Sequence, residues 1–397
     1  MDKPKTPPSS QSARPRLKFR PLSLVIKPPK SPEPQQQQLE LLKEKAAQLL
    51  LENPELRTFF FDKDLLRKYD ESSEKSLFLQ RLVKNSLDLS KKVLIYKASR
   101  DKARELSGED DFEILPKTEG INSGFIISTP SGARYFTKSF LNSEMSGKKK
   151  IHEYFIYKLL QYCGYGPKIH FSCHENMMPV IISEDLTTLK ADGTKKEFAP
   201  LAVKKDYEEF SPETEAHIIA SELLANLLGL ADFHKNNIGF VQTSGPKTTT
   251  QQKIKPKIID FHLDPTPEDL NFDLTFDESG DLKIFGHAYK IKEENLQKLH
   301  LQALQNLLNG THRRPPLKEA VVLALRDCET VCAQMSQGFE AEDFQITSES
   351  REEKEKSPIK RLIDQSSRDE SLMDFIKELN SKIDVLQEKI HQKSLVK

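Results

Sequence analysis

Three side chains between residues 232 and 260 have the types and the spacing of a phosphoryl-transfer site. Asp232 and Asn237 lie five positions apart, and Asp260 directly follows the hydrophobic residues Ile258 and Ile259. An aspartate can orient or deprotonate an attacking hydroxyl, while an asparagine oxygen and a second aspartate can hold magnesium against nucleotide phosphates. We therefore predict that Asp232 orients the nucleophile and that Asn237 and Asp260 are metal ligands.

The arrangement resembles the protein-kinase-like superfamily, whose catalytic loop spaces an aspartate and an asparagine in the same way and whose metal-binding aspartate precedes a phenylalanine. His234, two residues after Asp232, makes the loop more similar to that of phosphoinositide 3/4-kinases and HipA-like kinases. The resemblance covers about residues 112–261 and extends at most to 335. It implies an atypical kinase with ATP and Mg²⁺ as cofactors in a cleft between two lobes, and His234 among the catalytic residues. In style the chain is also similar to secreted effector kinases of intracellular bacteria.

Lys138 and Glu153 have the order and the spacing that this resemblance implies for the upstream part of a kinase site. Lys138 lies near the end of the third of three short predicted strands, where kinases keep the lysine that contacts the α- and β-phosphates, and Glu153 lies on the next predicted helix. Without the resemblance, the two would be ordinary surface charges. Further nucleotide contacts are implied in a covering loop at residues 119–124 and a hinge at 181–186. The implied nucleotide-binding positions are Lys138, Glu153, Gly120, Ser123, Gly124, Ile182 and Glu184.

Several positions depart from the protein-kinase pattern. The residues before Asp232 are Leu230 and Ala231 instead of His-Arg, and His262 stands where the glycine of Asp-Phe-Gly is expected. The polar run 242–255 predicts a loop inserted in a hairpin that joins the two metal ligands. None of these departures removes a metal ligand, so an active enzyme is favoured over the alternative, a catalytically silent interaction or scaffold protein with a kinase fold.

The elements that must position these residues follow from changes in hydrophobic periodicity. The pattern predicts strands at 112–115, 124–128, 134–140, 168–172 and 178–183, and helices at 148–162, 213–230, 296–308 and 317–335. We therefore predict an α+β chain with a two-lobed protein-kinase-like fold and extra N-terminal and C-terminal helices. The predicted divisions are a helical N-terminal region at 36–105, a small lobe at 106–186, a large lobe at 187–345, a charged linker at 346–366 and a C-terminal amphipathic helix at 367–397.

The first 35 residues have the composition of a disordered basic tail. Residues 1–31 contain eight lysines and arginines against one acid, with interspersed prolines. Contact with an anionic membrane surface and a merely solvated tail are both left open. We expect no nucleic-acid partner, because no aromatic stacking pattern accompanies the charges and the whole chain has a formal net charge of zero.

The C-terminal segment 372–390 has apolar residues at alternating spacings of four and three. They are Leu372, Ile376, Leu379, Ile383, Leu386 and Ile390. This is an a/d seam of about three heptads. It predicts either a helix that packs on its own domain or a short coiled coil for self-association or a partner, and the pattern does not choose between them.

The segment 261–282, which corresponds to the activation segment of kinases, contains seven acids and no lysine or arginine. These charges would repel an anionic phosphoinositide headgroup. The predicted substrate is therefore a protein with basic residues near the accepting hydroxyl, and a phosphoinositide kinase is the alternative. Part of the segment, 274–284, is equally consistent with a solvated hairpin away from the cleft.

The sequence contains neither an apolar signal-like region at the N-terminus nor an apolar run long enough to cross a bilayer. The four cysteines are too few for a disulfide scaffold. We therefore predict no transmembrane segment, and either a cytoplasmic protein or one secreted into a host cell without a cleaved signal peptide.

Overall fold

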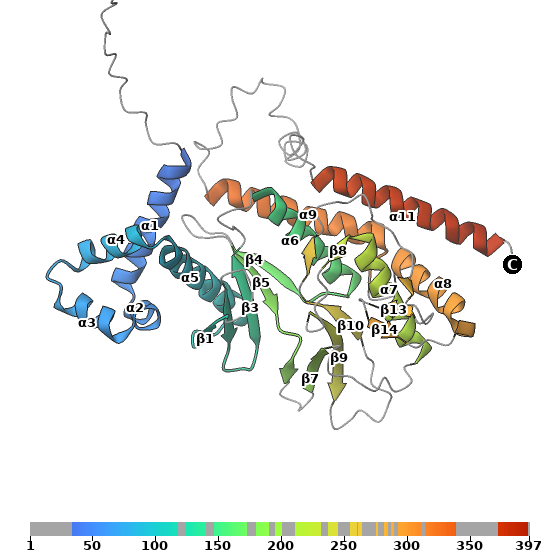
Figure 1. The fold of residues 1–397 in the computed structure, drawn as a ribbon, viewed down its shortest axis with the longest axis horizontal. Helices are drawn as coiled ribbons and strands as arrows, with labels where there is room; N and C mark the ends of the chain where they lie inside the picture. The colour runs from blue at the N-terminus through green and yellow to red at the C-terminus, as the bar shows by residue number, and fades with distance from the viewer. Residues whose placement is uncertain are drawn as a thin grey trace, which may run out of the picture.

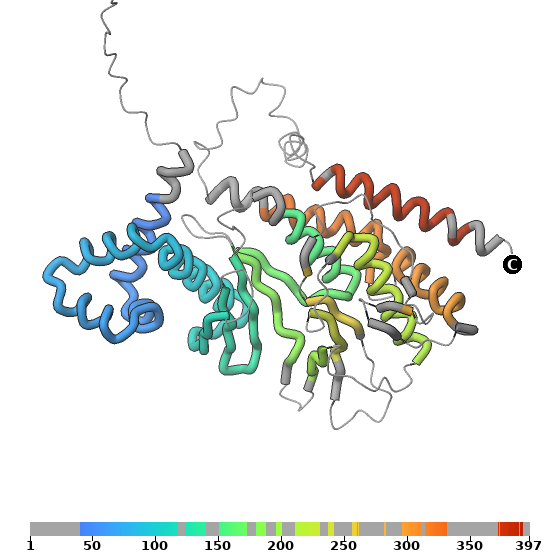
Figure 2. The backbone as a smooth tube through the Cα atoms, viewed as in Figure 1, coloured from blue at the N-terminus to red at the C-terminus, as the bar shows by residue number. Residues whose placement is uncertain are grey.

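The computed structural model describes residues 34–117, 124–139, 147–172, 180–189, 195–200, 211–231, 237–244, 255–259, 261–263, 275–276, 282–284, 287–289, 293–310, 314–338 and 372–395. Within these ranges the chain is an α+β protein (Figure 1). Helices of the N-terminal region, drawn in blue, lie at one end of the long axis, and the C-terminal helices lie at the other, with a sheet between them (Figure 2). No helix among the described residues is long and apolar enough to span a membrane.

Five helices form the N-terminal region. They are α1 (Pro34–Glu52), α2 (Pro54–Phe60), α3 (Lys63–Glu71), α4 (Lys75–Asn85) and α5 (Leu87–Ser107). α1 ends where Asn53-Pro54 predicts a break, because proline is accepted at the first turn of the next helix but not inside a helix. The Asp62 carboxylate caps α3 by accepting from the Leu65 amide at 2.8 Å.

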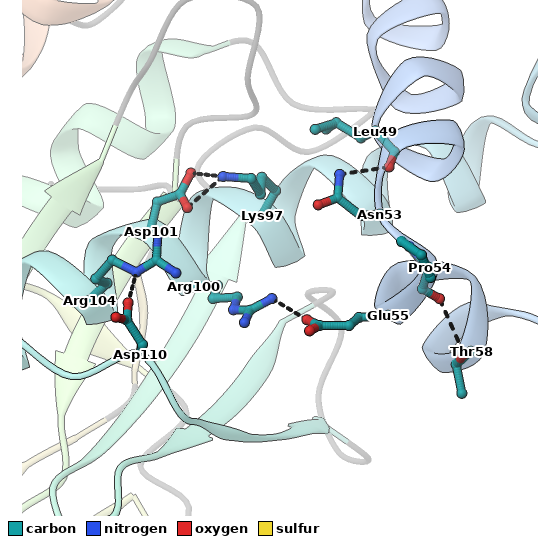
Figure 3. Close-up of polar contacts among 10 residues, drawn as sticks. All are labelled: Leu49, Asn53, Pro54, Glu55, Thr58, Lys97, Arg100, Asp101, Arg104 and Asp110. Atoms are coloured by element: carbon teal, nitrogen blue, oxygen red, sulfur yellow. Dashed lines mark hydrogen bonds and ion pairs between the residues drawn. The ribbon is translucent and has the colours of Figure 1, made fainter.

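The N-terminal helices are attached to α5 by side-chain contacts. Arg100 of α5 forms an ion pair with Glu55 of α2 at 2.6 Å (Figure 3). Gly108, with φ of 73°, ends α5 in the left-handed conformation that glycine adopts without strain. The helical region thus extends a few residues beyond 105.

The predicted strands form one antiparallel sheet. Its members are β1 (Glu113–Pro116), β2 (Phe125–Ser128), β3 (Arg134–Ser139), β4 (Ile169–Ser172) and β5 (Val180–Glu184), in the order β1-β2-β3-β5-β4. Between β3 and β4 the chain forms α6 (Gly147–Cys163), close to the predicted helix at 148–162.

The two faces of β5 belong to two different cores. Val180 and Ile182 pack with α5, whereas Ile181 belongs to the cluster that contains α6 and the helices of the second half of the chain. Successive strand residues point to opposite faces, and a strand covered on both faces carries a continuous apolar run. The sheet is therefore sandwiched between α5 and α6.

The second half of the chain contains short antiparallel sheets and long helices. A four-stranded sheet joins β10 (Lys255–Ile258), β9 (Ile238–Ser244), β7 (Lys195–Pro200) and β6 (Thr188–Leu189), while β8 (Leu230–Ala231) pairs with β11 (His262–Leu263). A third sheet contains β12 (Thr275–Phe276), β13 (Leu282–Ile284) and β14 (His287–Tyr289). The helices are α7 (Pro212–Leu227), α8 (Glu293–Asn309), α9 (Leu317–Gly338) and α11 (Leu372–Leu395).

Two details of this half differ from the prediction. The helix predicted at 213–230 ends at Leu227, because Gly229 takes φ of 61° and turns the chain so that Leu230 and Ala231 form β8. β6 and β7 were not predicted, since β7 (Lys-Lys-Glu-Phe-Ala-Pro) is too polar to show a strand pattern.

The seam of α11 is buried against the chain itself. Ile376, Leu379, Ile383 and Leu386 are at most 4% exposed, and they join one cluster with residues of α6, α8 and α9. In Figure 1 α11, drawn in red, runs alongside α9 and α8. This contact favours the first of the two predicted alternatives, a helix that packs on its own domain.

Candidate functional site

Lys138 and Glu153, predicted as partners, come together in the structure. β3 presents Lys138 and α6 presents Glu153, and the ammonium of Lys138 forms an ion pair with the carboxylate of Glu153. The side chains are only 14% and 19% exposed. A charge this far removed from water requires a partner, so the pair fixes the side chain of Lys138 toward α6.

The Lys138 ammonium has a second polar contact that the sequence analysis missed. It donates a hydrogen bond to the hydroxyl of Tyr157 at 2.7 Å and lies 4.3 Å from the centre of the Tyr157 ring. The same ring packs against Phe261, with 4.5 Å between ring centres. A signal for this contact existed, because Tyr157 follows Glu153 by one helical turn and so faces the same side of α6.

The backbone around the predicted catalytic loop is held by two antiparallel pairings. Ala231 pairs with His262, and the amide of Ile259 donates to the carbonyl of Asn237 at 2.7 Å. The residues on both sides of the loop are thereby brought beside the residues that flank position 260. The hairpin predicted around the polar run 242–255 is present as β9 and β10.

Among the residues predicted at this loop, the structure describes Asn237, which lies half-buried at the start of β9. Asp232, His234 and Asp260 lie outside the described residues, so their roles stay predictions. Groups of three or more His, Cys, Asp or Glu side chains that could hold a metal are absent from the part of the chain that the structure describes.

The nucleotide-covering loop is described only at its end. Gly120 and Ser123 lie outside the described residues, whereas Gly124 lies directly beside β3. A Cβ atom at Gly124 would lie 1.9 Å from the carbonyl oxygen of Thr137, the residue before Lys138. Glycine is therefore required here by the close approach of two backbones.

The hinge residues are anchored to neighbouring strands. Ile182 is fully buried and pairs with Thr137 of β3 and His170 of β4, and its contact with a nucleotide stays a prediction. Glu184 accepts hydrogen bonds from His170 at 2.8 Å and Lys168 at 3.0 Å. The bond from His170 is the main cause that lowers the pKa of Glu184, so its side chain is a carboxylate engaged within the sheet.

α6 contacts the C-terminal helices α9 and α11. Asp327 of α9 accepts from the hydroxyl of Tyr162 at 2.9 Å and forms an ion pair with Lys158 at 3.0 Å. Phe375 of α11 packs against Phe155 and His152, with 6.3 Å and 5.9 Å between ring centres. The helix that presents Glu153 is thus fixed on both sides of this residue by contacts distant in sequence.

A hollow of about 380 Å³ lies between α3 and α4. It is lined by residues that include Leu65, Lys68, Leu77, Phe78 and Arg81. None of the predicted site residues lines it, so it belongs to the N-terminal region and not to the candidate site.

A comparison with protein-family models finds no match, and a comparison with curated proteins finds none either. Among solved structures, the chain is similar to Rio2 kinase from Chaetomium thermophilum in an ADP/Mg²⁺-phosphoaspartate complex. The identity is 14% over 88% of this chain and 96% of that chain, with a TM-score of 0.32. It is also similar to the pseudokinase domain of BIR2, an immune regulator of the RLK/Pelle family, with 11% identity over 72% and 92% and a TM-score of 0.20.

TM-scores of 0.32 and 0.20 do not establish a shared fold, whereas the topology of this chain is informative by itself. A five-stranded antiparallel sheet contains Lys138, the helix after its third strand supplies Glu153 as the partner, and a mainly helical half follows. Two short antiparallel pairings in that half bracket the segment 232–236 and position 260. The predicted α+β, two-lobed kinase-like fold is thus confirmed.

Proposed function

We propose that the chain is an ATP- and Mg²⁺-dependent phosphotransferase that acts on a hydroxyl group of a protein. The ion pair between Lys138 and Glu153 is the observation that carries this proposal. Keeping a lysine ammonium largely out of water costs free energy, which a carboxylate offsets. A lysine held in this way would present its charge to the α- and β-phosphates of a nucleotide bound beside β3.

Asn237 and Asp260 would hold the magnesium ion. Their side-chain oxygens are the ligands that Mg²⁺ prefers, and the hydrogen bond from the Ile259 amide to Asn237 supports a shared site. The bound ion would neutralise charge on the phosphates. Asp232 would orient the attacking hydroxyl, with His234 beside it in the loop.

The charge of segment 261–282 supports a protein acceptor. Its seven acids, with no lysine or arginine, would attract basic residues near an accepting hydroxyl and repel an anionic lipid headgroup. Of this segment the structure describes residues 261–263, 275–276 and 282. β12 pairs with β13, in which Leu282 is buried. The seven acids lie outside the described residues, so their charge is taken from the sequence alone.

The test is transfer of labelled γ-phosphate by the purified chain in the presence of Mg²⁺. A mixed protein pool and phosphoinositide vesicles are offered as separate acceptors. We expect labelling of protein, and we expect Lys138→Met and Asp260→Ala each to abolish it. Lys97→Met is the matched control, because Lys97 also forms an ion pair, with Asp101 on the same helix, but lies on α5.

Three outcomes would contradict the proposal. ATP binding without transfer to any acceptor would indicate the alternative, a catalytically silent kinase-fold scaffold. Transfer to phosphoinositide alone would indicate a lipid kinase. Equal activity of Lys138→Met and Lys97→Met would remove Lys138 from the site.

A further inference from the structure

Tyr157 of α6 has a buried hydroxyl group, which a residue needed only for packing would not require. Its side chain is 3% exposed, and burying a phenol hydroxyl without a hydrogen bond is unfavourable. Here the hydroxyl meets the Lys138 ammonium at 2.7 Å. Phenylalanine would fill the same volume, so the hydroxyl itself has a role.

Glu153 and Tyr157 contact Lys138 together. They are four residues apart on α6, which places both on the side that faces β3. An ammonium group has three donors, and the carboxylate and the phenol account for two of them. The ammonium also lies within the distance of a cation–π contact with the ring.

The Tyr157 ring contacts the other half of the site as well. Phe261, which directly follows position 260, is 5% exposed and packs on this ring at 4.5 Å between centres, with the planes inclined by 44°. The ring therefore has one neighbour on β3 and another in the predicted metal-binding segment. Close packing on both sides keeps the ring, and with it the hydroxyl, in one position.

We infer that Tyr157 is a positioning residue that holds Lys138 through its hydroxyl. This inference rests on the proposed function for its meaning in catalysis, but the contact itself can be tested without activity. The Tyr157 hydroxyl supports Lys138 in the orientation that the phosphates of ATP require.

The test measures how fast Lys138 is acylated by an amine-reactive reagent, followed by peptide mass spectrometry at pH 8. Acylation requires the neutral amine, which the hydrogen bond from the ammonium to the phenol disfavours. Tyr157→Phe removes only the hydroxyl, and we expect it to accelerate labelling of Lys138 at least fivefold. Tyr154→Phe is the matched control, because Tyr154 lies on the same helix with the same 3% exposure. We expect this control to stay within twofold of the wild type.

Unfolding midpoints confirm that both variants fold. Equal labelling in Tyr157→Phe and Tyr154→Phe would overturn the holding role.

Steady-state kinetics separates this inference from the proposed function. We expect Tyr157→Phe to raise the KM for ATP at least threefold and to change kcat by less than twofold, a split that general destabilisation would not produce. Faster labelling in a chain that transfers no phosphate would support the contact and contradict the phosphotransferase. Normal transfer with unchanged labelling would do the reverse.

Discussion

His152 makes the contact between α6 and α11 sensitive to acid. Its ring lies 5.9 Å from that of Phe375, and burial lowers the pKa of His152 from 6.5 to about 4. Between these two values the unfolded chain binds a proton that the folded chain does not bind. The contribution of His152 to the free energy of unfolding is therefore fully present above pH 6.5 and is lost progressively as the pH falls toward 4.

The size of the effect follows from the two pKa values. One pH unit corresponds to about 1.4 kcal/mol, so the interval from 6.5 to about 4 is worth at most about 3.5 kcal/mol. This is a substantial part of the free energy of unfolding of a typical domain, which is about 5–15 kcal/mol. His152→Phe keeps an aromatic partner for Phe375 and removes the titrating group.

The assay is urea unfolding of the wild type and of His152→Phe between pH 7.5 and pH 4.5. We expect the difference in unfolding free energy between the two proteins to move in favour of the variant by about 2–3 kcal/mol over this range. His391→Gln, at an exposed position of α11, is the control and should follow the wild type. A wild type and a His152→Phe variant with parallel pH profiles would refute the reasoning.

Three further results are expected. Glu153→Gln should lower phosphate transfer about tenfold, less than Lys138→Met, because the lysine remains but loses its carboxylate; equal losses in a kinase assay would contradict this. Gly124→Ala should lower the unfolding free energy by at least about 2 kcal/mol in urea, since its Cβ would meet the Thr137 carbonyl; an unchanged midpoint would refute the close approach. Leu379→Ala, at a fully buried position of α11, should cost about 2–5 kcal/mol, whereas Val385→Ala at an exposed position of the same helix should cost under about 1 kcal/mol; similar costs would mean that the seam is not packed.

Local patterns were enough to predict most elements near the site. The alternation around Lys138 predicted β3, and the apolar spacing after it predicted α6 with Glu153 on it. These predictions succeed because burial on one face imposes a period of two on strands and 3.6 on helices, and both periods are written in neighbouring residues. That Lys138 and Glu153 meet was implied by the resemblance to kinases and not by the local pattern.

Contacts between distant segments could not be predicted in the same way. The seam of α11 predicted a helix with one apolar face, but the same pattern serves a partner chain or the chain's own domain, and only the fold shows α6, α8 and α9 against it. Likewise, only the fold shows that Ile182 is paired on both sides, with β3 and with β4. Strand register is decided by which strands become neighbours, and the local sequence of β5 does not contain that choice.

The contacts of Tyr157 show the same division most directly. Its position one turn after Glu153 was readable in the sequence, but the apolar spacing of the helix did not single it out. Its hydroxyl could have met any polar group there, and its ring any apolar one. That the hydroxyl meets Lys138 and the ring meets Phe261 depends on how β3 and the segment after β10 pack against α6. Such packing brings together residues more than a hundred positions apart, where no local period can report it.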